Sequence, residues 1–130
     1  MTTYVLDASA GADLLLDTAA GRDLLPRVQR GAQWWVPEHY FAEVASVLRR
    51  AESSGAITHE DAARAVGSLA TAPLHRVQVR PLLGEAWTKR GNLTIYDALY
   101  VVLAEHLHAV LVTTCLSTSM VIPAPPNPDA

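Results

Sequence analysis

Short apolar runs alternate with segments of helical spacing along this chain of 130 residues. The run Thr3–Leu6 is β-branched and apolar, which predicts a strand, and the apolar spacing of residues 10–16 predicts a helix directly after it. Further strands are predicted at 33–36, 74–79 and Val110–Thr113. Strands that alternate with helices favour a mostly parallel sheet, because parallel neighbours need crossover connections.

Helices are predicted between these strands, at 21–30, 38–53, 58–72, 81–90 and from 94 onwards. Pro26 should break the first of these helices. The helix that begins at Thr94 has almost no polar face before Glu105, so we expect it to be central and buried. The predicted fold is an α/β three-layer sandwich, in which helices flank a mostly parallel central sheet.

One domain is predicted over residues 1–122, followed by a flexible tail at 123–130, and residues 115–120 are predicted to form a turn or a short helix. No apolar run approaches the ~20 residues that cross a bilayer, and no basic stretch precedes the first apolar run. Cys115 is the single cysteine, which excludes an intrachain disulfide and fits a reducing compartment. We therefore expect a cytoplasmic protein without a membrane segment.

The net charge of −3 indicates that any binding to nucleic acid is local and does not depend on bulk charge. Most basic residues fall in the middle of the chain, where they either line a groove or belong to solvated helix faces. They are Arg49, Arg50, Arg64, Arg76, Arg80, Lys89 and Arg90.

Three carboxylates occupy informative positions. Asp7 directly follows the first strand, at the sheet edge where ligands bind in such folds, although an aspartate there is also a good helix N-cap. Glu43 lies on or beside the apolar stripe of its helix, where an inward-facing acid needs a partner. Asp97 follows Thr94 at the spacing of a helix cap, so it too has an ordinary structural explanation.

Three carboxylates that converge would repel one another unless a divalent cation neutralised them. Oxygen ligands without imidazole or thiolate select Mg²⁺ or Mn²⁺, and the chemistry suited to such a site is phosphodiester hydrolysis. The chain has no P-loop, GxGxxG or GxSxG motif. The histidines are expected to be structural or exposed and not to bind metal: His39, His59, His75, His106 and His108.

With these residues identified, the sequence resembles the PIN-domain family, and specifically the VapC-type toxins of bacterial toxin–antitoxin pairs. The strongest match is LTIYDALYVVLAEHLHAVLVTT at 93–114, with Asp97 as the third acid of the family pattern. YVLDASA resembles the family's first strand with Asp7 as the first acid, and PEHYFAEVASVLRR resembles its helix with Glu43 as the second acid. The three motifs follow in the family's order over nearly the whole chain.

The resemblance implies a metal-dependent endoribonuclease with Asp7, Glu43 and Asp97 as catalytic residues. It implies that Asp7 and Asp97 bind Mg²⁺, or Mn²⁺ as a substitute, and that the partners are an RNA substrate, a small VapB-type antitoxin that contacts the toxin near its active site, and a second copy of the chain. The family usually has an aspartate where this chain has Cys115.

Hydroxyl groups near that position have two interpretations. Ser9, Thr114 and Ser117 either support the acids or hold water there, or they belong to ordinary caps and turns. The loss of the fourth acid at Cys115 also motivates an alternative function, a catalytically weakened PIN fold that binds RNA or antitoxin. A receiver-like signalling domain would need a paired acid beside the first strand and a lysine after the last strand, whereas the only lysine is Lys89.

Overall fold

The computed structural model describes residues 2–28, 30–114 and 120–122. Five strands form one sheet in the order β3-β2-β1-β4-β5. Their bounds are β1 Thr3–Leu6, β2 Gln33–Pro37, β3 His75–Val77, β4 Val110–Thr113 and β5 Met120–Ile122. The first four strands pair in parallel, and β5 pairs antiparallel with β4. This confirms the prediction of a mostly parallel sheet.

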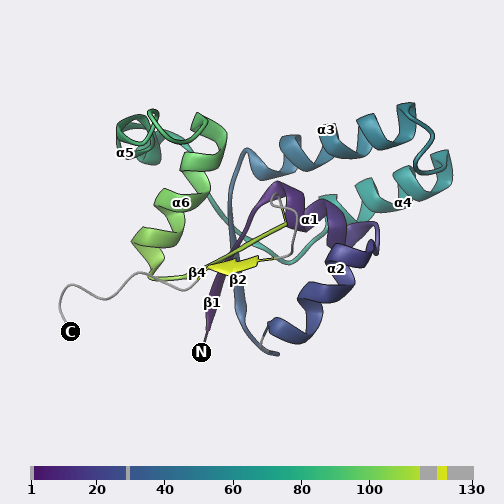
Figure 1. The fold of residues 1–130 in the computed structure, drawn as a ribbon, viewed down its shortest axis with the longest axis horizontal. Coiled ribbons are helices and arrows are strands. Elements are labelled where there is room, and N and C mark those ends of the chain that lie inside the picture. The colour runs from purple at the N-terminus through teal and green to yellow at the C-terminus, as the bar shows by residue number, and fades with distance from the viewer. Residues whose placement is uncertain (1, 29, 115–119, 123–130) are drawn as a thin grey trace.

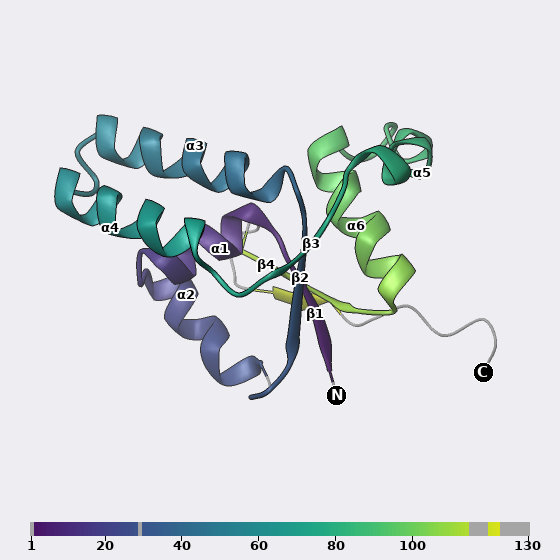
Figure 2. The same ribbon diagram turned by 180° about the vertical axis from the view of Figure 1, so that it is seen from behind.

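Helices cover both faces of the sheet, as Figures 1 and 2 show. They are α1 Ala8–Leu15, α2 Ala19–Leu24, α3 Tyr40–Ser53, α4 His59–Ala70, α5 Leu83–Thr88 and α6 Ile95–Leu107. Helices α1 to α4 lie on one side and α5 and α6 on the other, which gives three layers. The predicted α/β sandwich is therefore confirmed. Among the described residues, no helix is long and apolar enough to cross a membrane.

Strand β1 lies at the centre of the sheet because it is apolar enough to be buried on both faces. Val5 pairs with Trp35 of β2 on one side and with Leu111 of β4 on the other, and its side chain is fully buried. The carboxyl ends of β1 and β4 therefore lie next to each other, and the backbone N–H of Asp7 donates to the Val112 carbonyl at 3.1 Å.

Helix α6 agrees with its sequence prediction over most of its length. Ala98 to Ala104 are largely buried, and the Val102 side chain has no exposed surface. The first turn differs, because Tyr96 is 61% exposed and Asp97 is also exposed. The expectation that the whole helix is buried is therefore wrong for this turn, which extends beyond the edge of the sheet.

Other boundaries differ from the predictions. The segment predicted as one helix at 21–30 is α2 followed by a 3-10 turn, Leu25–Arg27, because Pro26 removes a backbone donor. The prediction of a turn or short helix over 115–120 is wrong at Met120, which begins β5, a strand that pairs antiparallel with the preceding strand β4. Cys115, Ser117 and the predicted tail at 123–130 lie outside the described residues.

Candidate active site

Asp7 lies where β1 ends and α1 begins. Its Oδ1 accepts hydrogen bonds from the Ala10 N–H at 2.9 Å and from the Ser9 hydroxyl at 2.8 Å. The N-cap interpretation is confirmed, yet only 8% of the residue is exposed, and a carboxylate taken out of water needs further compensation. Helix capping alone does not require that burial.

Burial raises the pKa of the Asp7 carboxyl above its ordinary value. Hydrogen bonds from Thr113, Ala10 and Ser9 act in the opposite direction, and the negative charge of Asp97 raises the pKa further. The charged form of Asp7 is therefore disfavoured in the folded protein. A proton or a nearby cation would relieve this cost.

Glu43 on α3 finds the partner that its position required. The Tyr100 hydroxyl donates to Glu43 Oε1 at 3.1 Å, and His39 Nε2 lies 3.2 Å from the same oxygen. Burial and Glu43 raise the pKa of the Tyr100 phenol far above its usual value, and Asp7 contributes to this shift. Tyr100 therefore stays protonated and keeps donating to Glu43.

Asp97 lies on the exposed first turn of α6. Its backbone N–H donates to the Thr94 hydroxyl oxygen at 3.1 Å, which confirms that Thr94 caps the helix. Within the described residues, the Asp97 carboxylate has no hydrogen-bond or ion-pair partner. It is therefore free to meet a ligand from solution.

The structure brings Asp7 and Asp97 within electrostatic reach of each other, and Tyr100 lies within reach of both Glu43 and Asp7. In the part of the chain that the structure describes, no three His, Cys, Asp or Glu side chains lie close enough together to hold a metal ion. Three carboxylates therefore do not form one ligand group, and the Glu43 carboxylate instead accepts the Tyr100 hydroxyl.

Two carboxylates are nevertheless enough for the expected ion. Mg²⁺ commonly takes one or two protein carboxylates and completes its shell with water and substrate phosphate. Asp7 has the buried charge that a cation would neutralise, and Asp97 has the unpartnered oxygen atoms. The donor chemistry of this pair therefore fits Mg²⁺ or Mn²⁺.

Hydroxyl groups connect the Asp7 cap to the end of β4. The Ser9 hydroxyl, which donates to Asp7, also lies 3.5 Å from the Thr113 hydroxyl and accepts the Thr114 N–H at 3.2 Å. The Thr114 hydroxyl in turn donates to the Asp13 carboxylate. Ser9 and Thr114, which the sequence suggested as supporting residues, thus join α1 to the sheet edge.

The contacts of Glu43 with Tyr100 and His39 were not predicted from the sequence. Tyr100 carried a usable signal, because a hydroxyl on an otherwise aliphatic helix needs a hydrogen-bond partner once it is buried. His39 carried none, because an isolated histidine is ordinary on a surface or in a core.

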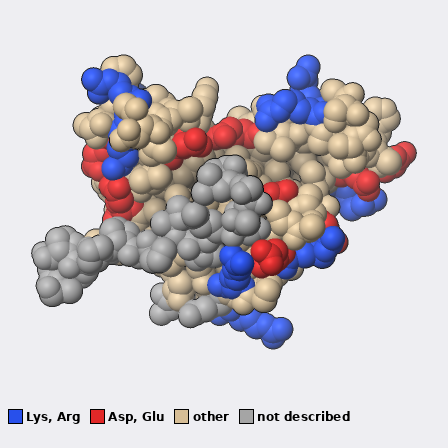
Figure 3. Space-filling view, in the orientation of Figure 1, with Lys and Arg blue, Asp and Glu red and all other residues tan. Residues whose placement is uncertain are grey.

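A groove of about 360 Å³ adjoins Glu43 along α3 and reaches the first turn of α6. We call it the Tyr96 groove; its lining includes His39, Glu43, Ser46, Arg50 and Tyr96. Figure 3 shows acidic side chains along the middle of this face, between the α5 and α3 sides, and basic side chains farther out on both sides. The basic residues of the middle of the chain therefore do not form one continuous patch on this face.

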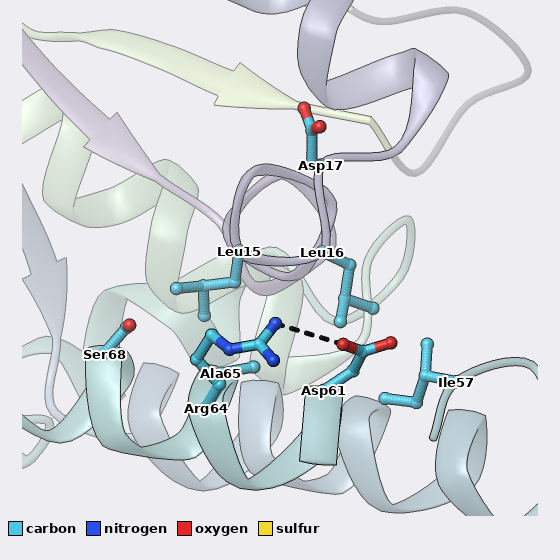
Figure 4. Close-up of a pocket in the computed structure, with 8 residues that line it drawn as sticks. All are labelled: Leu15, Leu16, Asp17, Ile57, Asp61, Arg64, Ala65 and Ser68. Atoms are coloured by element: carbon cyan, nitrogen blue, oxygen red, sulfur yellow. Dashed lines mark hydrogen bonds and ion pairs between the residues drawn. The ribbon is translucent and has the colours of Figure 1, made fainter. Parts of the chain in front are cut away.

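A separate cavity of about 220 Å³ lies at the end of α1 opposite to Asp7. Figure 4 shows Leu15 and Leu16 facing α4 there, beside the ion pair in which Arg64 Nη1 lies 3.1 Å from Asp61 Oδ1. Its only carboxylates are Asp17 and Asp61. This cavity takes no part in the candidate active site.

Comparison with known families agrees with this arrangement. A family model described as "PIN domain" matches residues 4–115, which include all three acids. The chain belongs to the PIN domain family. This PIN domain is 41% identical over 114 residues to ribonuclease VapC3 of Mycobacterium tuberculosis, a match that covers 85% of this chain and 80% of the relative. It is 34% identical to ribonuclease VapC12 of the same species, with 84% of each chain covered.

Solved structures show the same PIN fold. The crystal structure of PAE2754 from Pyrobaculum aerophilum has a TM-score of 0.64 at 25% identity and covers 88% of this chain and 76% of that chain. M. tuberculosis VapC20, a Sarcin-Ricin loop cleaving toxin, has a TM-score of 0.61 at 16% identity, with 82% and 84% of the two chains covered. At such low identity, the VapC20 likeness supports the fold alone.

Proposed function

We propose that this PIN domain is a VapC-type endoribonuclease toxin that hydrolyses RNA phosphodiester bonds with Mg²⁺, or with Mn²⁺ as a substitute. The proposal rests on the different environments of the two acids, Asp7 and Asp97. Asp7 is buried, and its charge is disfavoured in the field of Asp97, while the Asp97 carboxylate is exposed without a described partner. Binding of a divalent cation would lower the free energy of such a pair, because the cation neutralises both negative charges.

Asp7 and Asp97 would hold the ion, which supplies positive charge at the phosphoryl oxygen and favours ionisation of an attacking water. The chain's own groups fix the geometry. Ser9 and the Ala10 N–H orient the Asp7 carboxylate, and Tyr100 orients Glu43. Glu43 would accept a proton from the attacking water, since Tyr100 remains a donor and does not compete for that proton.

The named relatives support an antitoxin partner, whereas a homodimer is expected only from the family resemblance. The chain resembles ribonucleases VapC3 and VapC12, and solved structures with the same fold include a toxin–antitoxin complex from Klebsiella pneumoniae and VapBC2 from Rickettsia felis. The proposal therefore includes neutralisation by a cognate VapB-type antitoxin and assembly as a homodimer. The single cysteine favours a cytoplasmic location.

The test is cleavage of RNA by the purified protein with and without millimolar Mn²⁺ or Mg²⁺. Asp7→Asn and Asp97→Asn should each lower the cleavage rate on the order of 100-fold or more, because each removes a charge that holds the ion. Asp61→Asn is the matched control. Its N–H donates to Thr58 at 3.0 Å, the same capping arrangement that joins Asp97 to Thr94.

Asp61→Asn should cleave like wild type; if Asp97→Asn does so too, the Asp97 carboxylate has no part in catalysis and the site assignment is wrong. The alternative function, a weakened module that binds RNA or antitoxin, is favoured by Cys115 at the position of the family's usual aspartate. Wild-type protein that binds RNA but does not cleave it in Mn²⁺ would support that alternative.

A further inference from the structure

We propose that the Tyr96 groove binds one nucleobase of the RNA next to the scissile phosphate. Tyr96 would be the stacking platform, and Arg50 would contact the RNA backbone. The inference rests on the proposed ribonuclease function, because it assigns a substrate subsite to the same catalytic site.

Tyr96 is an exposed ring that packs against the ring of His39. It is 61% exposed, and its ring stacks on His39 with centroids 5.8 Å apart and planes at 28°. His39 in turn packs against the buried Tyr100 ring at 4.8 Å. An isolated exposed tyrosine is ordinary, but one face of this ring packs on His39, which in turn packs on Tyr100. The exposed part of the ring is available to stack on a base.

The position of Tyr96 connects it to the acids. It directly precedes Asp97 in the sequence, and Tyr100, one turn later on α6, donates to Glu43. Glu43 itself lines the groove. A base stacked on Tyr96 would therefore belong to a nucleotide whose phosphate lies at or beside the acid pair.

The opposite wall supplies a cation. Glu43 and Arg50 lie seven residues apart on α3, hence on the same face and about 10 Å apart along the helix axis, with Ser46 between them. No described carboxylate lies within ion-pair distance of Arg50. An unpaired guanidinium suits a phosphate, which it binds with two parallel hydrogen bonds.

The lining favours a nucleotide over the helix of a protein partner. Helix-binding grooves are lined mainly by aliphatic side chains, whereas this groove sets only Ala42 and Val47 beside an aromatic ring, an acid, a hydroxyl and a guanidinium. Proteins that bind single-stranded RNA combine these groups, with base stacking on aromatic rings and positive charge along the backbone. The volume of about 360 Å³ also lies within the usual range for small-ligand sites.

The first test measures binding of a short fluorescent single-stranded RNA in EDTA, by anisotropy. Tyr96→Leu should weaken the Kd roughly tenfold, while Tyr96→Phe should retain binding, because stacking needs the ring and not the hydroxyl. Trp87→Leu is the matched control, since Trp87 is 58% exposed but lies on α5 and outside the groove. It should leave the Kd unchanged.

A set of RNAs that each lack one base makes the test specific. At one RNA position, loss of the base should raise the Kd of wild type. With that RNA, the Kd values of wild type and Tyr96→Leu should be equal. At the other positions the difference should persist. Melting temperatures of all variants should match wild type, because the substituted side chains are exposed.

The salt dependence of binding tests Arg50. Arg50→Gln should lower the slope of log Kd against log salt concentration by about 1, because one phosphate contact is lost. Arg49→Gln should leave the slope unchanged, since Arg49 is the next residue in sequence but lines a different cavity, with Leu48 and His59.

The failures of the two proposals are distinguishable. If wild type cleaves RNA and Tyr96→Leu binds and cleaves it equally well, the groove inference is wrong while the ribonuclease function stands. If Tyr96→Leu weakens only inhibition by an antitoxin, the groove belongs to a protein partner and the inference is again wrong. If wild type neither binds nor cleaves RNA, both proposals fail.

Discussion

The two helix starts that carry Asp7 and Asp97 differ both in which residue caps the helix and in how far the acid is buried. At α1, Asp7 is itself the cap, is 8% exposed and accepts bonds from Ser9 and Ala10. At α6, the cap is Thr94, and Asp97 is exposed with no described partner for its carboxylate. The difference teaches that the Asp7 carboxylate is held in place and is costly to charge because it is buried, whereas the Asp97 carboxylate is exposed to solvent.

The different burial of the two acids allows the effect of losing a metal ligand to be separated from the effect of losing a buried charge. Neutralising Asp7 removes a buried charge and a metal ligand together, whereas neutralising Asp97 removes a ligand with little effect on folding. Measurements of metal binding and of folding stability can therefore test the two acids separately, from the largest expected effect to the smallest.

The largest expected effect is stabilisation by metal. Mn²⁺ at about one hundred times its Kd should stabilise wild type by about 2.7 kcal/mol, since a ligand that binds only the folded state shifts unfolding by mass action. Asp7→Asn and Asp97→Asn should each lose most of this gain, while Asp61→Asn should keep it. Thermal unfolding with Mn²⁺ and with EDTA measures the effect, and a shift that is equal in all four proteins would contradict the site.

Removal of the Tyr100 hydroxyl should have the next largest effect. Tyr100→Phe leaves Glu43 without its buried donor and should lower the unfolding free energy by about 1.5 kcal/mol. It should also lower kcat more than KM, because the variant affects the orientation of Glu43 and leaves the RNA-binding surface intact. Denaturant unfolding and single-turnover cleavage provide the measurements. A variant as stable and as active as wild type would show that Glu43 needs no such support.

A smaller effect of opposite sign is expected for Asp7→Asn in metal-free buffer. Because burial raises the folded-state pKa of Asp7 above its ordinary value of 3.8, the folded protein binds this proton more tightly than the unfolded chain does. Stability therefore falls as the pH rises from 3.8 through the folded-state pKa, and it is constant above that. Asparagine removes the penalty and keeps the cap.

The melting temperature of Asp7→Asn in EDTA should accordingly exceed that of wild type by a few degrees at neutral pH. The difference should vanish below about pH 4, where the wild-type carboxyl is protonated. An Asp7→Asn variant that melts earlier than wild type at neutral pH would mean that hydrogen bonds to the charged form outweigh its burial.

The smallest expected effect concerns Cys115, which stands at the position of the family's usual fourth aspartate. Cys115→Asp should tighten Mn²⁺ binding and raise the cleavage rate several-fold, because an added carboxylate supplies another hard oxygen. Cys115→Ser should do neither. Calorimetric titration measures the Kd for Mn²⁺, and cleavage assays measure the rate. If Cys115→Asp melts at a lower temperature than wild type in Mn²⁺ and cleaves no faster, position 115 has no part in the site.

The positions of strands and helices were predicted best where the local apolar pattern of the sequence coincides with burial in the fold. Strand β1 followed by Asp7, strand β4, and the apolar middle of α6 all have the expected positions. The partners of Glu43 were not predictable in this way, because Tyr100 lies 57 positions away in the sequence and only the packed fold brings the two together. Strand β5 has three residues, too few to show an alternating pattern, and its existence depends on pairing with β4.

The place of β1 at the middle of the sheet has a consequence for biosynthesis. The Asp7 N–H is fixed by the carbonyl of Val112, so the position of this acid depends on a strand that follows much later in the sequence. Contacts between such distant parts of a chain are slow to form. A nascent chain would lack this contact until β4 has left the ribosome, and Asp7 would not be fixed in place before that point.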